Sequence, residues 1–260
     1  MRVGLFVPCY VDQLRPAVGL AALALLERQG LDVVFPERQT CCGQPLLNAG
    51  GAREAKVLAE RFLGVFAGFD HVVCPSASCV ATVVHHYRDL LGPSPALDAI
   101  AGRTHELCAF LVDVLGIHAM RGSFPHRVAL HGSCHALRQL RQGPASERMA
   151  PPAPDPLRRL LASLDGIRFA EPSRPDECCG FGGTFSVEEE AVSRRMGLDR
   201  LADHERAGAE VVTSTDVSCL LHLEGLARRQ GRGPRLLHAA EILAGATAAE
   251  SATGAGSDAP

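Results

Sequence analysis

The same pattern of cysteines occurs twice in this chain, and it constrains the fold more than any other feature. Each copy has a single cysteine, an adjacent pair and a further single cysteine: Cys9, Cys41, Cys42 and Cys79, then Cys134, Cys178, Cys179 and Cys219. The spacings are 32, 1 and 37 residues in the first copy and 44, 1 and 40 in the second. Because chance does not duplicate such an array, the sequence predicts two copies of one structural unit.

The residues around these cysteines repeat as well. "RVGLFVPC" at 2–9 returns as "RVALHGSC" at 127–134, and each apolar run is typical of a β-strand. In both copies helical patterns separate this run from a second one before the double cysteine and a third before the last cysteine. Alternating strands and helices imply right-handed crossovers and parallel sheets. The sequence therefore predicts an α/β fold made of two pseudo-symmetric β-α-β-α-β repeats.

The expected organisation has four parts. Residues 1–103 form the first repeat, 104–126 a connecting helix, 127–245 the second repeat, and 246–260 a disordered tail of small and polar residues. The helix is expected over 104–117, with a threonine cap at its start. Five prolines between residues 142 and 156 indicate a surface loop that holds most of the extra length of the second repeat.

All eight repeated cysteines follow strand-like runs, so they are expected at the carboxyl ends of parallel strands, where sites in such sheets lie. Four gathered thiolates bind a soft acceptor, either zinc or an iron–sulfur cluster. Neither copy has the two C-x₂-C knuckles of a structural zinc site. Adjacent cysteines aim their side chains in different directions, which favours a polynuclear cluster over a single ion. The glycines after each pair would let the backbone approach such a cluster.

Two further cysteines lie outside the repeated array. Cys108 falls within an apolar helical pattern, where an isolated cysteine is most often a small core residue. Cys74 lies five residues before Cys79, and Ser214 stands at the matching place in the second copy. We expect Cys74 in the core or in contact with the ligand cysteines.

Four polar residues near the array have two interpretations each. His131 and His135 flank Cys134 and could hydrogen-bond a ligand or carry a proton, or they could have a surface or capping role. Ser76 and Asp216 each lie three residues before the last cysteine of a copy. They could cap the following helices or reach the surroundings of a cluster.

Composition and motifs exclude several classes of function. The net charge is −3, no basic stripe occurs and tryptophan is absent, so we expect no nucleic-acid partner. No apolar stretch approaches the roughly 20 residues of a membrane span, and the amino-terminal run resembles a strand more than a signal peptide. We therefore expect a cytoplasmic protein, with peripheral attachment to a membrane left open. Nucleotide-binding glycine motifs and a nucleophile elbow are missing, which favours electron transfer over hydride or acyl chemistry.

Six phrases together resemble the cysteine-rich CCG domain family: "LFVPCYVD", "CCGQPLLNAG", "PSASC", "HGSCH", "CCGFGGTFS" and "TDVSC". This domain occurs in iron–sulfur subunits of heterodisulfide reductase, of anaerobic glycerol-3-phosphate dehydrogenase and of glycolate oxidase. Among stand-alone chains, the sequence is most similar to the lactate utilization protein A family, over residues 2–244.

The resemblance implies an iron–sulfur electron-transfer subunit, non-catalytic or co-catalytic, of a system that oxidises L-lactate to pyruvate. It implies two partners, a ferredoxin-like iron–sulfur subunit and a third subunit. The family's ligands carry over onto the eight repeated cysteines. The fullest family pattern ends in C-x-x-C, but Ser76 and Asp216 replace the first cysteine here, so one [4Fe-4S] cluster per repeat fits the count. Zinc in one repeat is an alternative.

Two rival functions stay open from the sequence. One is a heterodisulfide or thiol–disulfide reductase-type subunit, which would cleave a substrate disulfide at an open cluster. The other is a zinc-bound structural scaffold without a redox role.

Overall fold

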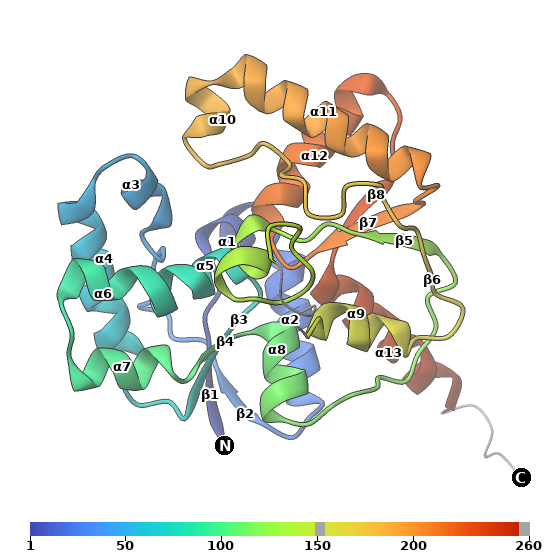
Figure 1. The fold of residues 1–260 in the computed structure, drawn as a ribbon. Helices are drawn as coiled ribbons and strands as arrows, with labels where there is room; N and C mark the ends of the chain where they lie inside the picture. Colours follow the sequence, from blue (N-terminus) through green and yellow to red (C-terminus); the bar gives the residue numbers. More distant parts are fainter. Residues whose placement is uncertain (149–153, 255–260) are drawn as a thin grey trace, which may run out of the picture.

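The computed structural model describes residues 1–148 and 154–254, and its strands form two four-stranded, fully parallel sheets. The first sheet has the order β2-β1-β3-β4, with strands β1(Arg2–Leu5), β2(Asp32–Val34), β3(His71–Cys74) and β4(Thr104–Glu106). The second has the order β6-β5-β7-β8, with strands β5(Arg127–Leu130), β6(Arg168–Phe169), β7(Val211–Ser214) and β8(Arg235–His238). The identical order in both sheets confirms the two-repeat α/β fold (Figure 1).

Helices connect the strands in both halves. Before β5 the helical segments are α1(Cys9–Leu14), α2(Pro16–Glu27), α3(Gln44–Asn48), α4(Ala52–Phe66), α5(Ala77–Ala81), α6(Tyr87–Leu91), α7(Pro95–Ala101) and α8(Leu107–Ala109), with π-helical turns η1(Thr82–His86) and η2(Phe110–Val114). After β5 they are π-helical turn η3(His135–Gln139), α9(Pro156–Ala162), α10(Phe185–Glu188), α11(Glu190–Arg206), α12(Val217–Gln230) and α13(Ala239–Gly254).

Each sheet has a fourth strand that the sequence pattern did not predict. The helix expected over 104–117 begins only at Leu107, because Thr104–Glu106 pairs with β3 as β4. Glu106, rather than the threonine, caps the helix: its Oε2 accepts a hydrogen bond from the Ala109 N–H at 3.1 Å. A β-branched threonine suits a strand as well as a cap, which explains the error. In the second repeat β8 takes the equivalent place.

Two other expectations concern loops and ends. Helix α13 overlaps the first part of the tail 246–260 that was expected to be disordered, and residues 255–260 lie outside the described residues. Of the proline-rich loop expected over 142–156, residues 149–153 also lie outside them. Within the described residues, no helix combines the length and apolar character needed to cross a membrane.

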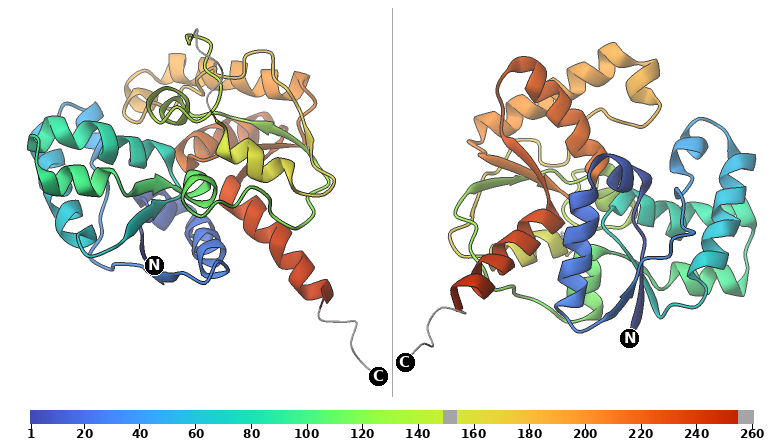
Figure 2. Two further views of the ribbon diagram at one scale, coloured as in Figure 1. Left: turned by 60° about the horizontal axis from the view of Figure 1, so that its bottom comes forward. Right: turned by 180° about the vertical axis from the view of Figure 1, so that it is seen from behind.

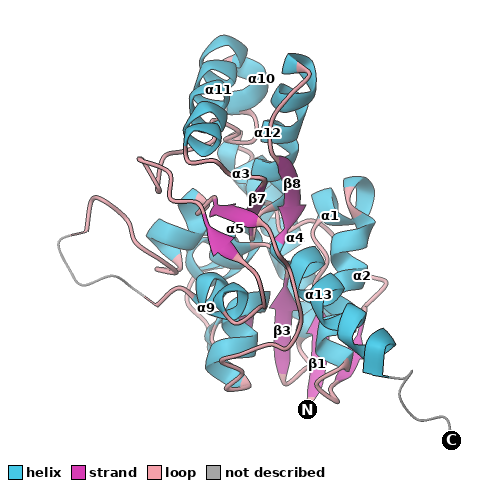
Figure 3. Cartoon of the chain, turned by 90° about the vertical axis from the view of Figure 1, so that its right-hand side faces the viewer, coloured by secondary structure: helices cyan, strands magenta, loops and turns pink. Residues whose placement is uncertain are grey.

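One hydrophobic core joins the two repeats. Helix α2 of the first half packs along α13 of the second (Figures 2 and 3). Buried side chains from both halves meet there, including Val3 and Val18 from one half and Val128, Val211 and Leu243 from the other. Two smaller clusters fill the remaining side of each sheet. The two repeats are therefore held in a fixed relation, with the carboxyl ends of their strands near one another.

Candidate metal centre

All eight repeated cysteines line one pocket between the repeats, with a cavity volume of about 120 Å³. In each half they follow the carboxyl ends of three strands, β1, β2 and β3 or β5, β6 and β7. Parallel pairing of these strands aligns their carboxyl ends, which brings together thiols that are far apart in the sequence. The structure thus gathers all eight predicted positions; their role as ligands stays a prediction.

The first quartet consists of two close sulfur pairs. The Sγ atoms of Cys9 and Cys41 are 3.6 Å apart, and those of Cys42 and Cys79 are 3.4 Å apart. Cys9 begins helix α1 and Cys79 lies on α5, while the adjacent pair sits on the loop after β2. None of these cysteines forms a disulfide.

The second quartet repeats this arrangement. Cys134 lies beside Cys178, and Cys179 lies beside Cys219, so the same two pairs occur as in the first quartet. The sulfurs of Cys179 and Cys219 and one ring nitrogen of His131 all lie within 4.8 Å of one another. Among the described residues, the second quartet is the one with a histidine nitrogen this close to two of its sulfurs.

A glycine follows each cysteine pair, in the same left-handed conformation. Gly43 and Gly180 both have φ of +87°, a region that side chains with a Cβ rarely adopt. Their N–H groups point at the first cysteine of each pair, at 3.4 Å from the sulfur of Cys41 and 3.3 Å from that of Cys178. A Cβ on Gly180 would lie 2.5 Å from the carbonyl oxygen of Ser193. The C-C-G sequence is thus needed for a turn that supplies N–H groups to sulfur.

Each quartet concentrates negative charge on one sulfur. Hydrogen bonds from the thiols of Cys42 and then Cys9 lower the pKa of Cys41 to about 3. In the second repeat, hydrogen bonds from Cys134 and then Cys179 lower the pKa of Cys178 to about 2. A soft cation displaces the protons of neighbouring thiols when it binds. Four sulfurs with N–H support and no carboxylate among them fit an iron–sulfur cluster or zinc.

Asp216 lies between the quartets and connects the repeats. Its Oδ1 accepts hydrogen bonds from the Ser76 hydroxyl at 2.9 Å and from the Ser78 hydroxyl at 2.7 Å and N–H at 3.1 Å. It stands at the start of α12 without capping that helix. Ser76 does cap its helix, α5, since its Oγ accepts from the Cys79 N–H at 3.4 Å. Of the two interpretations, Ser76 follows the capping one, and Asp216 instead fixes the loop of the opposite repeat.

Other side chains close the pocket from both halves. A hydrogen bond of 2.9 Å joins Gln44 Nε2 to His135 Nε2, so His135 bridges the repeats. The rings of Tyr10 and Phe181 meet edge to face, with centroids 5.8 Å apart. The sequence singled out His135, but it did not indicate which residues of the opposite repeat these side chains contact.

His131 is buried and faces a buried arginine. Its Nδ1 accepts a hydrogen bond from Nε of Arg200 at 3.3 Å, and burial lowers its pKa to about 3, so the ring is neutral. Arg200 itself is fully buried and forms an ion pair with Asp203 at 3.2 Å. Sequence reasoning missed Arg200 because the polar run in α11 resembles a solvated helix. Aligning α11 with the amphipathic helix α4 would have revealed charged residues at positions that are apolar in α4.

The two unrepeated cysteines are core residues. Cys108 is buried in the core shared by both repeats, as predicted. Cys74 is buried in the first repeat beside Cys79, and its thiol donates to the carbonyl oxygen of Ser76 at 3.7 Å. Cys74 therefore both packs in the core and touches the first quartet.

A second cavity of about 420 Å³ lies behind the second quartet. Its lining includes His131, Asp155 and the buried Glu106. Burial raises the pKa of Glu106 to about 7. Hydrogen bonds from the N–H groups of Cys108 and Ala109 act in the opposite direction and lower this pKa, but by less. This carboxyl group is therefore half protonated near neutral pH.

Comparison with known proteins agrees with the duplicated site. The model of the CCG cysteine-rich domain matches twice, over residues 3–83 and 128–224. Lactate utilization protein A of Geobacillus kaustophilus is 39% identical over 247 residues, covering 94% of this chain and 98% of that protein. The proteins of the same name from Halalkalibacterium halodurans and Bacillus subtilis are both 37% identical, covering 94% of this chain and 96% and 99% of theirs. The chain therefore belongs to the lactate utilization protein A family, with two CCG cysteine-rich domains.

Proposed function

We propose that this chain is an iron–sulfur electron-transfer subunit in the oxidation of L-lactate to pyruvate. The observation that carries the proposal is the convergence of eight unpaired cysteines, four from each repeat, on one pocket. The relatives, which are named lactate utilization protein A, supply the link to lactate utilization. When bound, an iron–sulfur cluster accepts and releases single electrons.

The chain's own residues would hold one [4Fe-4S] cluster per repeat. Four cysteines in each half supply the thiolates, and the N–H groups of Gly43 and Gly180 stabilise negative charge on sulfur. Tyr10 and Phe181 meet across the pocket and limit the access of water. The chemical step on lactate belongs, in this proposal, to a partner. We propose a ferredoxin-like iron–sulfur subunit and a third subunit as partners, in the cytoplasm.

Metal analysis tests the proposal directly. Iron, acid-labile sulfide and zinc are measured per chain on anaerobically purified protein, with EPR spectra before and after dithionite. About eight iron and eight sulfide per chain with a reducible signal is the expected result for two four-iron clusters. About four iron with one zinc would make one repeat structural. Zinc alone, also after anaerobic reconstitution, would overturn the redox function.

The shared pocket favours one second candidate, a thiol–disulfide reductase-type subunit. Both quartets face the same space, so a substrate disulfide could reach either of them. Cleavage of one disulfide to two thiols consumes two electrons and two protons, and a reducing partner would supply the electrons. Stoichiometric thiol release from a model disulfide by the dithionite-reduced, cluster-loaded chain, after excess dithionite is removed, would favour this function over lactate oxidation.

A further inference from the structure

The two repeats differ in the side chains that lie behind their cysteines. The helices after the two cysteine pairs can be aligned by the glycine that each one packs against. Gly43 lies against Ala55 of α4, and Gly180 lies against Ser193 of α11. With these positions matched, Phe62 and Phe66 of α4 correspond to Arg200 and His204 of α11. The strands align Phe6 with His131, since both lie three residues before the first cysteine of their quartet.

In the first repeat these three positions form an apolar wall. The Phe6 ring lies edge-on to Phe62 and Phe66, with centroids 5.1 and 5.6 Å away. All three are buried. Their rings offer no N–H or O–H group to a cysteine sulfur or a cluster.

In the second repeat all three positions carry nitrogen. His131, Arg200 and His204 are 1%, 0% and 0% exposed. Nε of Arg200 donates to Nδ1 of His131 at 3.3 Å, and the His131 and His204 rings lie 6.0 Å apart. A polar cluster of this kind in a core is costly unless its groups are paired. Its presence at one of two equivalent places calls for a role that the other place lacks.

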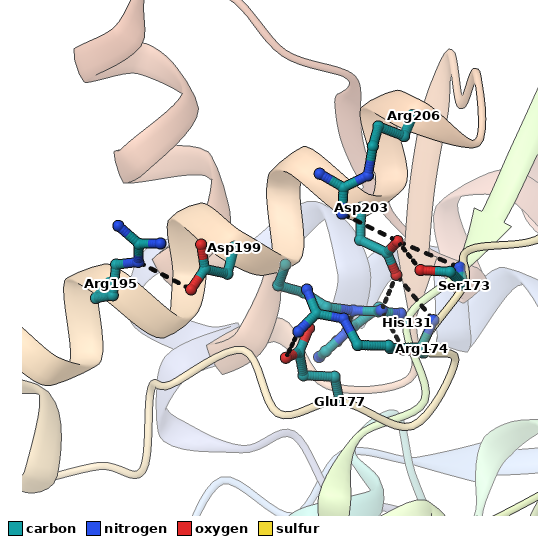
Figure 4. Close-up of polar contacts among 9 residues, drawn as sticks. His131, Ser173, Arg174, Glu177, Arg195, Asp199, Asp203 and Arg206 are labelled. Carbon is teal, nitrogen blue, oxygen red and sulfur yellow. Dashed lines mark hydrogen bonds and ion pairs between the residues drawn. The ribbon is translucent and has the colours of Figure 1, made fainter.

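Arg200 is fixed by several acceptors. Its guanidinium donates to the carbonyl oxygens of Arg174 and Pro175 and to Oδ2 of Asp203. Asp203 is fixed in turn by the Ser173 hydroxyl at 2.6 Å and the Arg174 N–H at 3.0 Å (Figure 4). The guanidinium therefore has one position from which to reach the His131 ring.

This contact decides how His131 can act. A guanidinium keeps its protons, so Nδ1 of His131 has to be the acceptor, and the neutral ring carries its proton on Nε2. A histidine that ligates a metal normally donates its other N–H to an acceptor, which Arg200 is not. With a ring nitrogen within 4.8 Å of the sulfurs of Cys179 and Cys219, His131 is suited to donate an N–H to sulfur.

We propose that His131, oriented by Arg200, donates a hydrogen bond to the sulfur centre of the second repeat and raises the reduction potential of its cluster above that of the first. Hydrogen-bond donors and positive charge near cluster sulfurs stabilise the reduced, more negative state. The phenylalanine wall of the first repeat supplies neither. Arg200 is the positioning residue in this role, and the inference rests on the proposed iron–sulfur function.

The test is an EPR-monitored redox titration of the cluster-loaded protein, after iron and sulfide have been counted. Cys41→Ser and Cys178→Ser variants assign each signal to its repeat. We expect two separate midpoints in the unmodified chain, with the higher one absent from Cys178→Ser. His131→Leu should lower that midpoint towards the other. His131→Gln, which can still accept from Arg200 and donate to sulfur, should restore most of the difference.

Phe6→Leu is the matched control, since it changes the equivalent wall of the first repeat and should leave the higher midpoint unchanged. Coinciding midpoints, or the higher one in the first repeat, would overturn the inference while leaving the iron–sulfur function intact. So would an unshifted midpoint in His131→Leu with its full iron content. If His131→Leu fails to load a cluster, the inference is tested by the order of the two midpoints in the unmodified chain and by the midpoint of His131→Gln. An absence of iron would overturn the proposed function and the inference together.

Discussion

Within each adjacent cysteine pair, the two residues have different surroundings. Cys42 and Cys179 are buried, with exposed fractions of 2% each, whereas Cys41 and Cys178 are partly exposed and hold the thiolate charge. The pair thus presents one inner and one outer sulfur to the same pocket. The adjacency that raises strain for a disulfide is useful for two separate metal bonds.

Replacement of one outer cysteine should separate the two sites. We expect Cys178→Ser to lose the iron and sulfide of the second repeat and to keep those of the first, because each quartet is built from its own strands. Iron and sulfide counts per chain measure this. Cys108→Ser is the control, since Cys108 lies in the core away from the quartets. Loss of all iron in Cys178→Ser would mean that both repeats share one cluster.

The buried Glu106 should make stability depend on pH. Its pKa of about 7 in the fold exceeds the ordinary value of 4.5, so the folded protein keeps a proton that the unfolded chain loses. The stabilisation is complete below pH 4.5 and is lost as the pH rises to about 7. Relative to Glu106→Gln, the unmodified protein should lose about 1.4 kcal/mol per pH unit across that window.

Urea unfolding of both proteins between about pH 5 and 8 measures this difference. The amide of the Glu106→Gln variant retains an oxygen that can accept from the Ala109 N–H, so the cap itself is preserved. Parallel stability curves for the two proteins would show that Glu106 is ionised throughout.

At the scale of elements, sequence periodicity located the strands that precede the repeated cysteines. It missed β4 and β8, which no repeated cysteine follows. Strand β4 was assigned to a helix because its threonine suits a cap, and β8 has no cysteine after it to mark it. The helix α11 was expected, but not its buried arginine. Periodicity predicts which face of a helix is buried only when that face is apolar. Here Arg200 occupies a position that Phe62 fills in α4.

Two helical glycines offer a test of how tightly α11 is packed. A Cβ on Gly197 would clash with Cδ1 of Leu226 and lie 3.1 Å from the carbonyl oxygen of Cys179. Gly197→Ala should therefore destabilise the protein by about 1–3 kcal/mol and disturb the second quartet. Gly64→Ala in α4 meets nothing within 4 Å and should stabilise by up to about 1 kcal/mol.

Urea midpoints and iron content measure both glycine effects. Equal responses of the two variants would contradict the close approach of α11 to the second cysteine pair.

At the scale of the whole molecule, the sequence showed the duplication but not how the two repeats pack against each other. The cysteine spacing predicted two similar sites at strand ends, and the structure gathers their residues as expected. That both sites open into one pocket depends on how the repeats pack. Contacts such as Asp216 with Ser76 and Gln44 with His135 join side chains from opposite repeats. Periodicity within one repeat holds no information about such pairs.

The common core predicts cooperative unfolding. Since α2 and α13 bury side chains of both repeats together, neither half keeps its core alone. We expect the loss of helical circular dichroism and the bleaching of cluster absorbance to follow a single urea transition. The outcome that contradicts this is a plateau at which one repeat has lost its cluster and the other has not. Leu243→Ala should lower the midpoint of both signals equally, with a cost of about 2–5 kcal/mol.

The single pocket also affects how sensitive the protein is to oxygen. Molecular oxygen and thiol reagents that reach the sulfurs of one repeat reach those of the other through the shared pocket. A partner that docks over this pocket would shield both halves at once. Oxidation of the two cysteine quartets, and protection from it, should therefore occur together.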